Sequence, residues 1–214
     1  MIIVPEHARA ALAEFNVSRE TTEKLALLAA ELERWQKIKN LVGPKTLDEV
    51  WSRHIVDSLQ LYSLAPDAKT WLDLGSGAGF PGLVVAIAGI EKGLHMHLVE
   101  SNARKCSFLR QVARLTGARV TVHQERLEDI IPDFVGKVNV VSARALASLS
   151  TLLAWTEPLL KRGTTGTIAL FPKGRDVLAE LTEARKSWTV EADILPSRTD
   201  PEARILRITS IESL

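Results

Sequence analysis

Apolar residues recur every three or four positions along the first third of the chain, which is the period of a helix with one buried face. The pattern predicts a short helix over residues 5–15 and a longer one over about 20–41. The apolar stripe of the longer helix consists of Leu25, Leu28, Ala29, Leu32 and Trp35. Gly43-Pro44 breaks this helix, because glycine and proline both interrupt helical winding.

A third helix is predicted after this break. Thr46 and Glu49 form a capping box, in which the threonine caps the helix and the glutamate bonds back to it. The apolar positions that follow are Val50, Trp51, Ile55, Leu59 and Tyr62. Pro66-Asp67 ends the segment, so residues 1–66 are predicted to form a helical unit ahead of the rest of the chain.

Short apolar strands alternate with helical segments over residues 67–214. We predict strands over residues 70–74, 94–99, 119–123, 138–142, 167–171, 189–194 and 204–209. The helices between them are predicted over 102–116, with Ser101 as cap and Gly117 as stop, over 146–160, ending near Gly163, and over 177–186. This alternation is typical of an α/β fold, here a mostly parallel, seven-stranded, Rossmann-like sheet with helices on both faces.

The most informative stretch is the turn from the first strand to the helix that follows it. Gly75, Gly77 and Gly79 come directly after the strand, and Pro81 stands at a first-turn position, where its missing N–H costs nothing. Glycines in such a turn permit positive φ or the close approach of a ligand. A strand, a glycine-rich loop and a helix in this order predict a site for a nucleotide-type cofactor.

Two cofactor classes fit this loop. Residues 77–82 satisfy the G-x-G-x-x-G pattern of dinucleotide-binding proteins, although Gly77 comes two residues later than that pattern requires. The other register, residues 73–79, places Asp73 at the strand end and resembles the first motif of class I S-adenosylmethionine-dependent methyltransferases. Glu100 ends the second strand, where an acid accepts hydrogen bonds from ribose hydroxyls, and both classes require it.

Absent residues separate the enzyme classes better. A short-chain dehydrogenase needs a tyrosine with a lysine four residues later, whereas Tyr62, the only tyrosine, is followed by Pro66. Methyltransferases that act on exocyclic amines usually carry an Asn/Asp-Pro-Pro-aromatic turn after strand four, where residues 142–145 read Ser-Ala-Arg-Ala. Cys106, inside an apolar helix, is interpreted as a core residue and not as a nucleophile. Among the reactions considered, this leaves the methylation of a nucleophile that needs little activation.

Composition limits the partners and the compartment. The 214 residues are 46% hydrophobic and 25% charged, which is ordinary for a globular protein, and no apolar run is long enough to span a bilayer. We expect no signal peptide, no metal site and, from the single cysteine, a reducing cytoplasm. The net charge of +1 excludes a basic nucleic-acid arm, yet residues 101–124 hold basic and no acidic side chains, and such patches attract phosphates.

Six motifs, in order and at plausible spacing, resemble a single family. They are Asn40-Leu41, residues 53–59 (RHIVDSL), residues 72–82 (LDLGSGAGFPG), residues 125–128 (ERLE), Ser142 with Arg144-Ala145, and Lys173-Gly174. They resemble the bacterial small-subunit rRNA methyltransferase G family, also called glucose-inhibited division protein B. The resemblance implies methyl transfer from S-adenosylmethionine to N7 of one guanine of 16S rRNA, nucleotide 527 in the family's nomenclature. The expected partner is 16S rRNA or a 30S particle, and we expect a cytoplasmic monomer without metal or membrane association.

The resemblance also implies roles for individual residues. The expected cofactor contacts are Gly75, Gly77, Phe80, Glu100, Leu127, Glu128 and Arg144. Leu127 and Glu128 match the family's adenine-contacting pair, and core packing is the alternative for Phe80. Arg144 matches an arginine at the cofactor and substrate site, with a structural salt bridge as the alternative.

Catalysis is expected to depend mostly on positioning, because guanine N7 carries a free lone pair and needs no general base. Arg144 and His54 are the candidate catalytic residues, and Asp57 shares a helix face with His54. For His54, a buried, hydrogen-bonded core position is the alternative. The predicted RNA contacts are Lys173, Arg110, Arg114 and Arg126, for which an ordinary solvated surface is the alternative.

Two other functions fit the same residues. One is a methyltransferase of this fold that acts on another RNA or on a small molecule, and the other is a non-catalytic RNA-binding assembly factor. Binding of S-adenosylmethionine separates the enzymes from a binding module that has lost the cofactor, and binding of NADH would favour the dinucleotide register.

Overall fold

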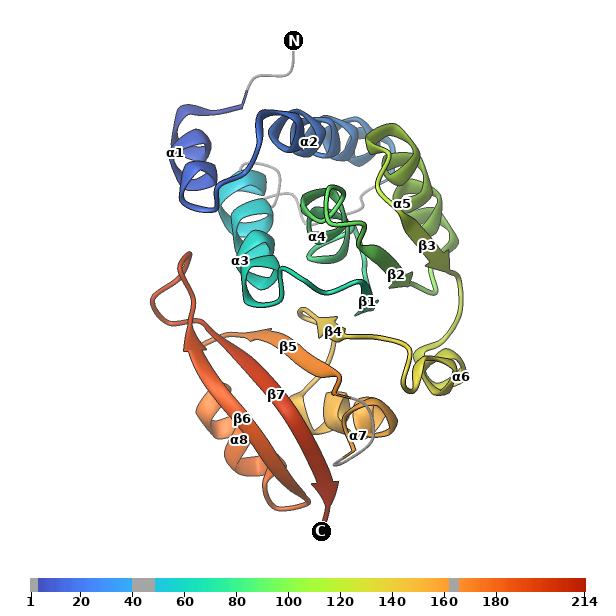
Figure 1. Ribbon diagram of the computed structural model, residues 1–214, viewed down its shortest axis with the longest axis vertical. Helices are drawn as coiled ribbons and strands as arrows, with labels where there is room; N and C mark the ends of the chain where they lie inside the picture. The colour runs from blue at the N-terminus through green and yellow to red at the C-terminus, as the bar shows by residue number, and fades with distance from the viewer. Residues whose placement is uncertain (1–3, 40–48, 162–165) are drawn as a thin grey trace.

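The computed structural model describes residues 4–39, 49–161 and 166–214, which form a seven-stranded sheet of order β3-β2-β1-β4-β5-β7-β6 (Figure 1). The strands are β1 Thr70–Leu74, β2 His95–Val99, β3 Val120–His123, β4 Val140–Ala143, β5 Ile168–Lys173, β6 Trp188–Pro196 and β7 Arg204–Ser213. The first five run parallel, whereas β7 is antiparallel to both β5 and β6. The predicted α/β class and mostly parallel sheet are confirmed.

Helices cover both faces of this sheet (Figure 1). They are α1 Glu6–Glu14, α2 Arg19–Lys39, α3 Asp57–Leu64, α4 Gly82–Ala88, α5 Ala103–Thr116, α6 Leu127–Ile130, α7 Leu149–Leu160 and α8 Val177–Ala184, with a π-helix, η2, over Val50–Val56 and a 3-10 helix, η3, over Ile131–Phe134. None of the helices in the described ranges is long and apolar enough to cross a lipid bilayer.

Successive residues of β1 point to opposite faces, and each face is buried against its own helices. Trp71 belongs to the core shared with α2, α4 and α5, in which Leu28 and Phe108 are fully buried. Leu72 and Leu74 belong to the second core, which α7 and α8 cover. The helices predicted at the start of the chain therefore complete one of the two outer layers of the fold, with α2 packed against α4 and α5.

The N-terminus of α5 corrects one prediction. Asn102, and not Ser101, caps this helix, because the Asn102 side-chain oxygen accepts hydrogen bonds from the N–H groups of Arg104 (3.0 Å) and Lys105 (3.2 Å). These are the second and third residues of the helix, which is the reach of an Asn side chain at the cap position. The predicted stop is confirmed, since Gly117 follows the helix with a left-handed φ of 71°.

Two other helices differ from the prediction. α7 begins at Leu149, with Ser148 as its cap, because the chain bends through residues 144–147 and Ala145 has a φ of 50°. Residues 50–56 form the π-helix η2 ahead of α3, and His54 is half-buried in it, whereas Val50, Trp51, Ile55 and Val56 are buried. The predicted cap Thr46, the motif Asn40-Leu41 and the predicted helix ends near Leu41 and Gly163 lie outside the described residues.

Asn102→Ala is expected to lower the free energy of unfolding by about 1 kcal/mol, because two N–H groups of α5 lose their acceptor. The matched control is Ser101→Ala, which we expect to change stability by less than about 0.5 kcal/mol. Chemical denaturation of both variants measures the difference. Equal losses would show that Ser101 shares the capping role.

Candidate active site

The loop after β1 depends on three glycines. Gly75, Gly77 and Gly79 have φ angles of 63°, 56° and 89°, which L side chains rarely adopt. A Cβ at Gly75 would lie 2.5 Å from a methyl carbon of Leu146, whereas at Gly77 the nearest atom would be 3.8 Å away. The predicted strand, glycine loop and helix are confirmed, although Pro81 precedes α4 instead of lying in its first turn. Protein atoms therefore crowd Gly75 but leave the Cβ side of Gly77 open.

Glu100 joins the end of β2 to this loop. One of its carboxylate oxygens accepts a hydrogen bond from the Gly77 N–H (3.0 Å), and the other accepts one from the Asn102 N–H (2.8 Å). The residue is only 8% exposed. Because a carboxylate has about four acceptor sites, Glu100 can hold the loop and still accept a hydrogen bond from a ligand hydroxyl.

A cavity of about 440 Å³ lies against this loop, and we call it the glycine-loop cavity. Four of the predicted cofactor residues line it, namely Gly75, Glu100, Leu127 and Glu128. Arg126, which the sequence analysis assigned to RNA, lines the same cavity. Ligands of open α/β sheets bind outside the carboxyl ends of the strands, which is where this cavity lies.

Asp73, at the end of β1, is a fully buried carboxylate that the sequence analysis did not assign a role. Its Oδ1 accepts a hydrogen bond from Ser142 Oγ (2.7 Å), which in turn accepts one from Trp71 Nε1 (2.9 Å). Its Oδ2 has no hydrogen-bond partner among the described residues. Burial raises the pKa of Asp73 from 3.8 to about 6, because the charged form is desolvated.

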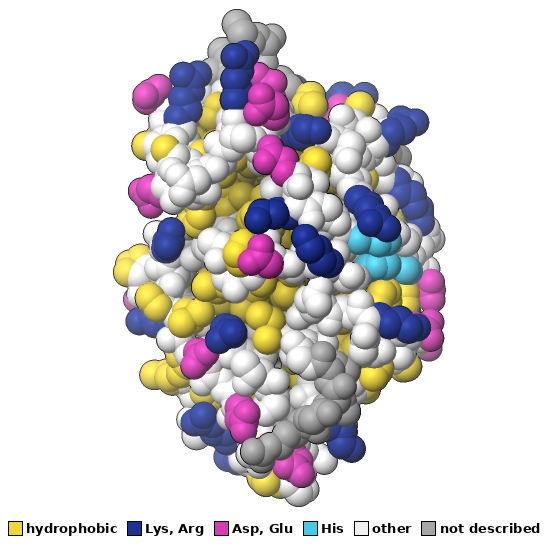
Figure 2. Space-filling view, viewed as in Figure 1, with side chains coloured by type: hydrophobic (Ala, Val, Ile, Leu, Met, Phe, Trp, Pro, Cys, Tyr) yellow, Lys and Arg dark blue, Asp and Glu magenta, His cyan; other side chains and the backbone are white. Residues whose placement is uncertain are grey.

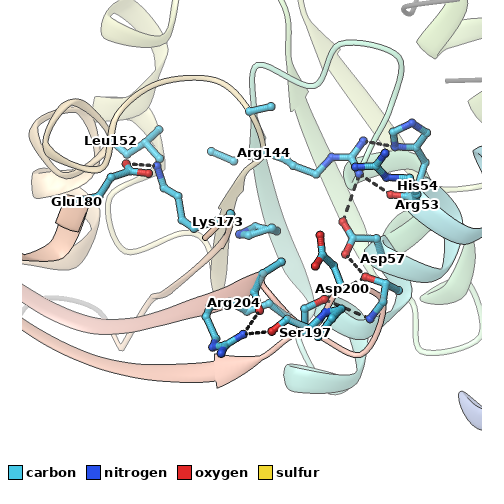
Figure 3. Close-up of a pocket in the computed structure, with 18 of the residues that line it drawn as sticks. Arg53, His54, Asp57, Arg144, Leu152, Lys173, Glu180, Ser197, Asp200 and Arg204 are labelled. Atoms are coloured by element: carbon cyan, nitrogen blue, oxygen red, sulfur yellow. Dashed lines mark hydrogen bonds and ion pairs between the residues drawn. The ribbon is translucent and has the colours of Figure 1, made fainter. Parts of the chain in front are cut away.

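A second cavity, of about 730 Å³, lies beside the first, and Ala145 lines both. We call it the Arg144 cavity, because the guanidinium of Arg144 lies in its wall at the helix that carries His54 (Figure 3). Arg144 donates to His54 Nδ1 (2.8 Å), to Asp57 Oδ2 (3.3 Å) and to the Arg53 carbonyl (3.2 Å). The predicted site residues His54 and Arg144 are thus in direct contact.

Phe80 supports this contact from the glycine loop. Its ring centroid lies 5.0 Å from that of His54 and 5.6 Å from the Arg144 guanidinium carbon. Phe80 is only 7% exposed, so the core packing considered in the sequence analysis describes most of its surface. A cation near an aromatic ring is favourable, and the stack therefore couples the glycine loop to Arg144.

His54 is a hydrogen-bond acceptor at neutral pH. Burial, together with the charges of Arg144 and Arg53, lowers the pKa of His54 from 6.5 to about 4. The imidazole is therefore neutral, and because Nδ1 accepts from Arg144, the ring proton resides on Nε2. Burial also lowers the pKa of Arg144 itself, while Asp57 opposes that change and keeps the guanidinium charged.

Asp57 connects Arg144 to the turn between β6 and β7. Its Oδ1 accepts hydrogen bonds from Thr199 Oγ1 (2.8 Å) and Gln60 Nε2 (2.6 Å), while its Oδ2 pairs with Arg144. The Gln60 side-chain oxygen accepts from the Arg198 N–H (3.0 Å). The turn forms one wall of the Arg144 cavity. No sequence motif indicated this, because the turn lies about 140 residues along the chain from Asp57.

The basic residues fall into two groups. Those that line the Arg144 cavity already donate to protein oxygens: Arg53 to Glu49, Arg144 to Asp57, Lys173 to Glu180 and Arg204 to backbone carbonyls of its own turn. The side chain of Lys173, predicted to contact RNA, is only 9% exposed. Arg110 and Arg114 are exposed on α5 and line a separate depression beside β3, so the structure does not bring them to Arg144. Figure 2 shows Lys and Arg side chains interspersed with Asp and Glu over one face.

Solved structures show which fold this chain shares. The chain matches the SAH-bound methyltransferase PaMTH1 of Podospora anserina with a TM-score of 0.63 and 13% identity, over 97% of this chain and 98% of that one. It matches the ribosomal protein L11 methylase of Lactobacillus delbrueckii subsp. bulgaricus with a TM-score of 0.54 and 16% identity, over 74% and 78% of the chains. The fold is that of the class I S-adenosylmethionine-dependent methyltransferases.

Sequence comparison identifies the family within this class. Residues 21–200 match the family model of rRNA small subunit methyltransferase G. The Ribosomal RNA small subunit methyltransferase G of Methylobacterium radiotolerans is 63% identical over 207 residues, which are 97% of this chain and 96% of the relative. The protein of the same name from a Bradyrhizobium species is 50% identical over 211 residues, 98% of this chain and 94% of the relative. The chain belongs to the rRNA small subunit methyltransferase G family, as its motifs predict.

Asp73→Asn is expected to become more stable, relative to the wild type, as the pH rises from 4 to 8. The raised pKa means that folded Asp73 holds its proton up to about pH 6, whereas the unfolded carboxyl loses it near 3.8. Wild-type stability therefore falls across this window, by up to about 3 kcal/mol, and asparagine removes that fall. Urea unfolding at several pH values measures it, with the exposed Asp133→Asn as control. Parallel stability curves for wild type and Asp73→Asn would contradict the buried-charge argument.

Proposed function

We propose that this protein transfers the methyl group of S-adenosylmethionine to N7 of one guanine in 16S rRNA, nucleotide 527 in the nomenclature of its family. The observation that carries the proposal is the adjacency of two cavities, one built on the glycine loop and the other around Arg144, with Ala145 in the lining of both. Membership of the rRNA small subunit methyltransferase G family supports the choice of substrate.

The residues of the glycine-loop cavity fit the donor. Glu100 lines this cavity and retains acceptor sites for ribose hydroxyls. Gly77, whose N–H donates to Glu100, does not line the cavity itself, but its open Cβ side leaves space beside the loop. Leu127 and Glu128 offer an apolar side chain and a carboxylate to the adenine. S-adenosylmethionine supplies an electrophilic methyl carbon attached to a positively charged sulfur. The chain therefore has to hold this group and exclude competing acceptors.

The Arg144 cavity is suited to positioning and not to proton transfer. Guanine N7 has a lone pair and no proton to lose, and His54 is neutral with its Nδ1 occupied by Arg144. Arg144 carries donors that match guanine O6, which lies next to N7 on the same edge of the base. His54, Asp57 and Phe80 orient the guanidinium, while carboxylates in the cavity wall offset the positive charge that develops on the base.

The guanine has to enter this cavity as an unstacked base. N7 faces the deep, narrow major groove of A-form RNA, which side chains do not read. Enzymes that modify a base act on a single-stranded region or turn the base out of the stack. A cavity of about 730 Å³ next to the glycine loop gives such a base room to bind.

A methylation assay tests the proposal. The purified protein is incubated with methyl-labelled S-adenosylmethionine and either naked 16S rRNA or 30S particles from cells that lack the protein. We expect one labelled guanine, identified by strand cleavage at its N7-methylated base. Cofactor binding without transfer to either substrate would contradict the proposal and favour an assembly factor. Label at another position or on another RNA would contradict the specific target.

Arg144→Lys is expected to lower kcat/KM for the rRNA by about 10²- to 10³-fold, because lysine keeps the charge but loses the planar set of donors. The ion pair with Asp57 can persist, so the melting temperature should change little. The control is Arg207→Lys, since Arg207 pairs with Asp193 on the β6–β7 surface away from both cavities. A near-normal kcat/KM for Arg144→Lys would show that Arg144 has only a structural role, in its ion pair with Asp57.

A further inference from the structure

One carboxylate in the wall of the Arg144 cavity forms no ion pair with a basic side chain of the described residues. Four acidic residues line the cavity, and three of them hold a basic partner: Glu49 with Arg53 (3.0 Å), Asp57 with Arg144 (3.3 Å) and Glu180 with Lys173 (2.7 Å). Among the described residues, no basic side chain pairs with the fourth, Asp200. An unpaired carboxylate in a binding cavity can accept hydrogen bonds that a ligand donates.

The conformation of Asp200 is fixed by its own turn. Its Oδ1 accepts a hydrogen bond from the Glu202 N–H (2.9 Å), and its backbone carbonyl accepts one from the Ala203 N–H (3.1 Å). No hydrogen bond to Oδ2 is formed within the described part of the chain. In Figure 3 the carboxylate of Asp200 stands on the turn side of the Arg144 cavity. The side chain is therefore oriented before any ligand arrives.

The β6–β7 turn, which carries Asp200, is hydrogen-bonded to the residues that hold Arg144. Thr199, the neighbour of Asp200, donates to Asp57, which pairs with Arg144 through its other oxygen. The guanidinium of Arg198 lies 5.2 Å from the ring centroid of Phe15, at the end of α1. A chain of contacts through Asp57 thus sets the position of Asp200 relative to Arg144, and both residues line the same cavity.

We propose that Asp200 reads the target base: its carboxylate accepts hydrogen bonds from N1–H and the N2 amino group of guanine. This assignment rests on the proposed function. Guanine carries N7 and O6 on one edge, and its donors N1–H and N2–H follow O6 on the adjacent edge of the six-membered ring. If N7 faces the glycine-loop cavity and O6 faces Arg144, these donors face the neighbouring part of the cavity wall. Asp200 lines the same cavity, and no basic side chain of the described residues pairs with it.

Such a contact distinguishes guanine from the other purine. Adenine offers a lone pair at N1 and no amino group at C2, so its approach to Asp200 would leave the carboxylate without a donor and place two acceptors together. Asp200 is exposed in the free protein, and a bound base would cover it, so an analogue that lacks the donor would leave this carboxylate without a partner. Asp200 is therefore a specificity-determining residue, and Arg144 and Asp200 hold two edges of one base.

The experiment compares two 16S rRNAs, one with guanine and one with inosine at the target position. Inosine keeps N7, O6 and N1–H but lacks the N2 amino group. We expect wild-type protein to lose about tenfold in kcat/KM on the inosine RNA. Asp200→Ala should lose about tenfold to a hundredfold on the guanine RNA and treat the two RNAs alike. Glu202→Ala, in the same turn, should keep the wild-type ratio.

Asp200→Asn controls for the possibility that Asp200→Ala disrupts the turn, because the amide oxygen of asparagine can still accept the hydrogen bond from the Glu202 N–H. We expect it to keep the wild-type melting temperature and to lose part of the preference for guanine. A wild-type ratio of guanine to inosine in folded Asp200→Ala and Asp200→Asn would overturn the assignment while leaving the proposed function intact. Wild-type protein that methylates neither RNA would overturn the proposed function and this assignment with it.

Discussion

The guanidinium of Arg144 is the contact on which the geometry of the site depends. It joins the loop after β4 to His54 and Asp57, residues about 90 positions earlier in the chain, and through Asp57 to the β6–β7 turn. A cation that is largely withdrawn from water is stable only when its donors are satisfied, so each partner also fixes the others. The Arg144 cavity is shaped by this network, and the glycine loop is tied to it through Phe80.

The glycine loop and the end of β1 contain features that lower the stability of the fold and lie at the proposed binding site. The fully buried Asp73 disfavours folding, because one of its oxygens has no hydrogen-bond partner among the described residues. The three left-handed positions are filled by glycines, whose ordering costs more chain entropy than that of other residues. Two cores with many fully buried apolar side chains offset these costs, one on each face of the sheet. Departures of this kind from ordinary stability rules tend to occur at functional sites, and here they converge at the carboxyl end of β1.

How far the sequence predicts this site depends on whether the signal is local. Gly75, Gly77 and Gly79 are adjacent in the chain and their φ requirements are local, so the loop and its cavity could be predicted. Lys173 could be predicted to reach the cavity but not to be held there by Glu180, since that ion pair depends on how α8 packs. His54 could be named as a candidate from its motif, but its contact with Arg144 could not, because the two residues lie 90 positions apart and meet only when η2 packs against the loop after β4. The walls contributed by residues 197–204 arise from the antiparallel return of β7, which only the folded sheet reveals.

The distribution of charge indicates which part of a nucleotide the Arg144 cavity accepts. A phosphate needs positive charge that no carboxylate already offsets, yet the basic side chains that line this cavity bond to carboxylates or carbonyls of the described chain. Arg144 uses three of its five N–H groups on His54, Asp57 and the Arg53 carbonyl, so it can still donate to a base. A base needs the reverse, namely oriented donors and acceptors in a nearly neutral wall, with a carboxylate able to offset charge that develops on the ring. Arg144 and Asp200, which line the same cavity, supply such a donor and such an acceptor, in agreement with the proposal that the base binds there. The RNA backbone then has to be held outside it, where exposed basic residues such as those of α5 meet solvent.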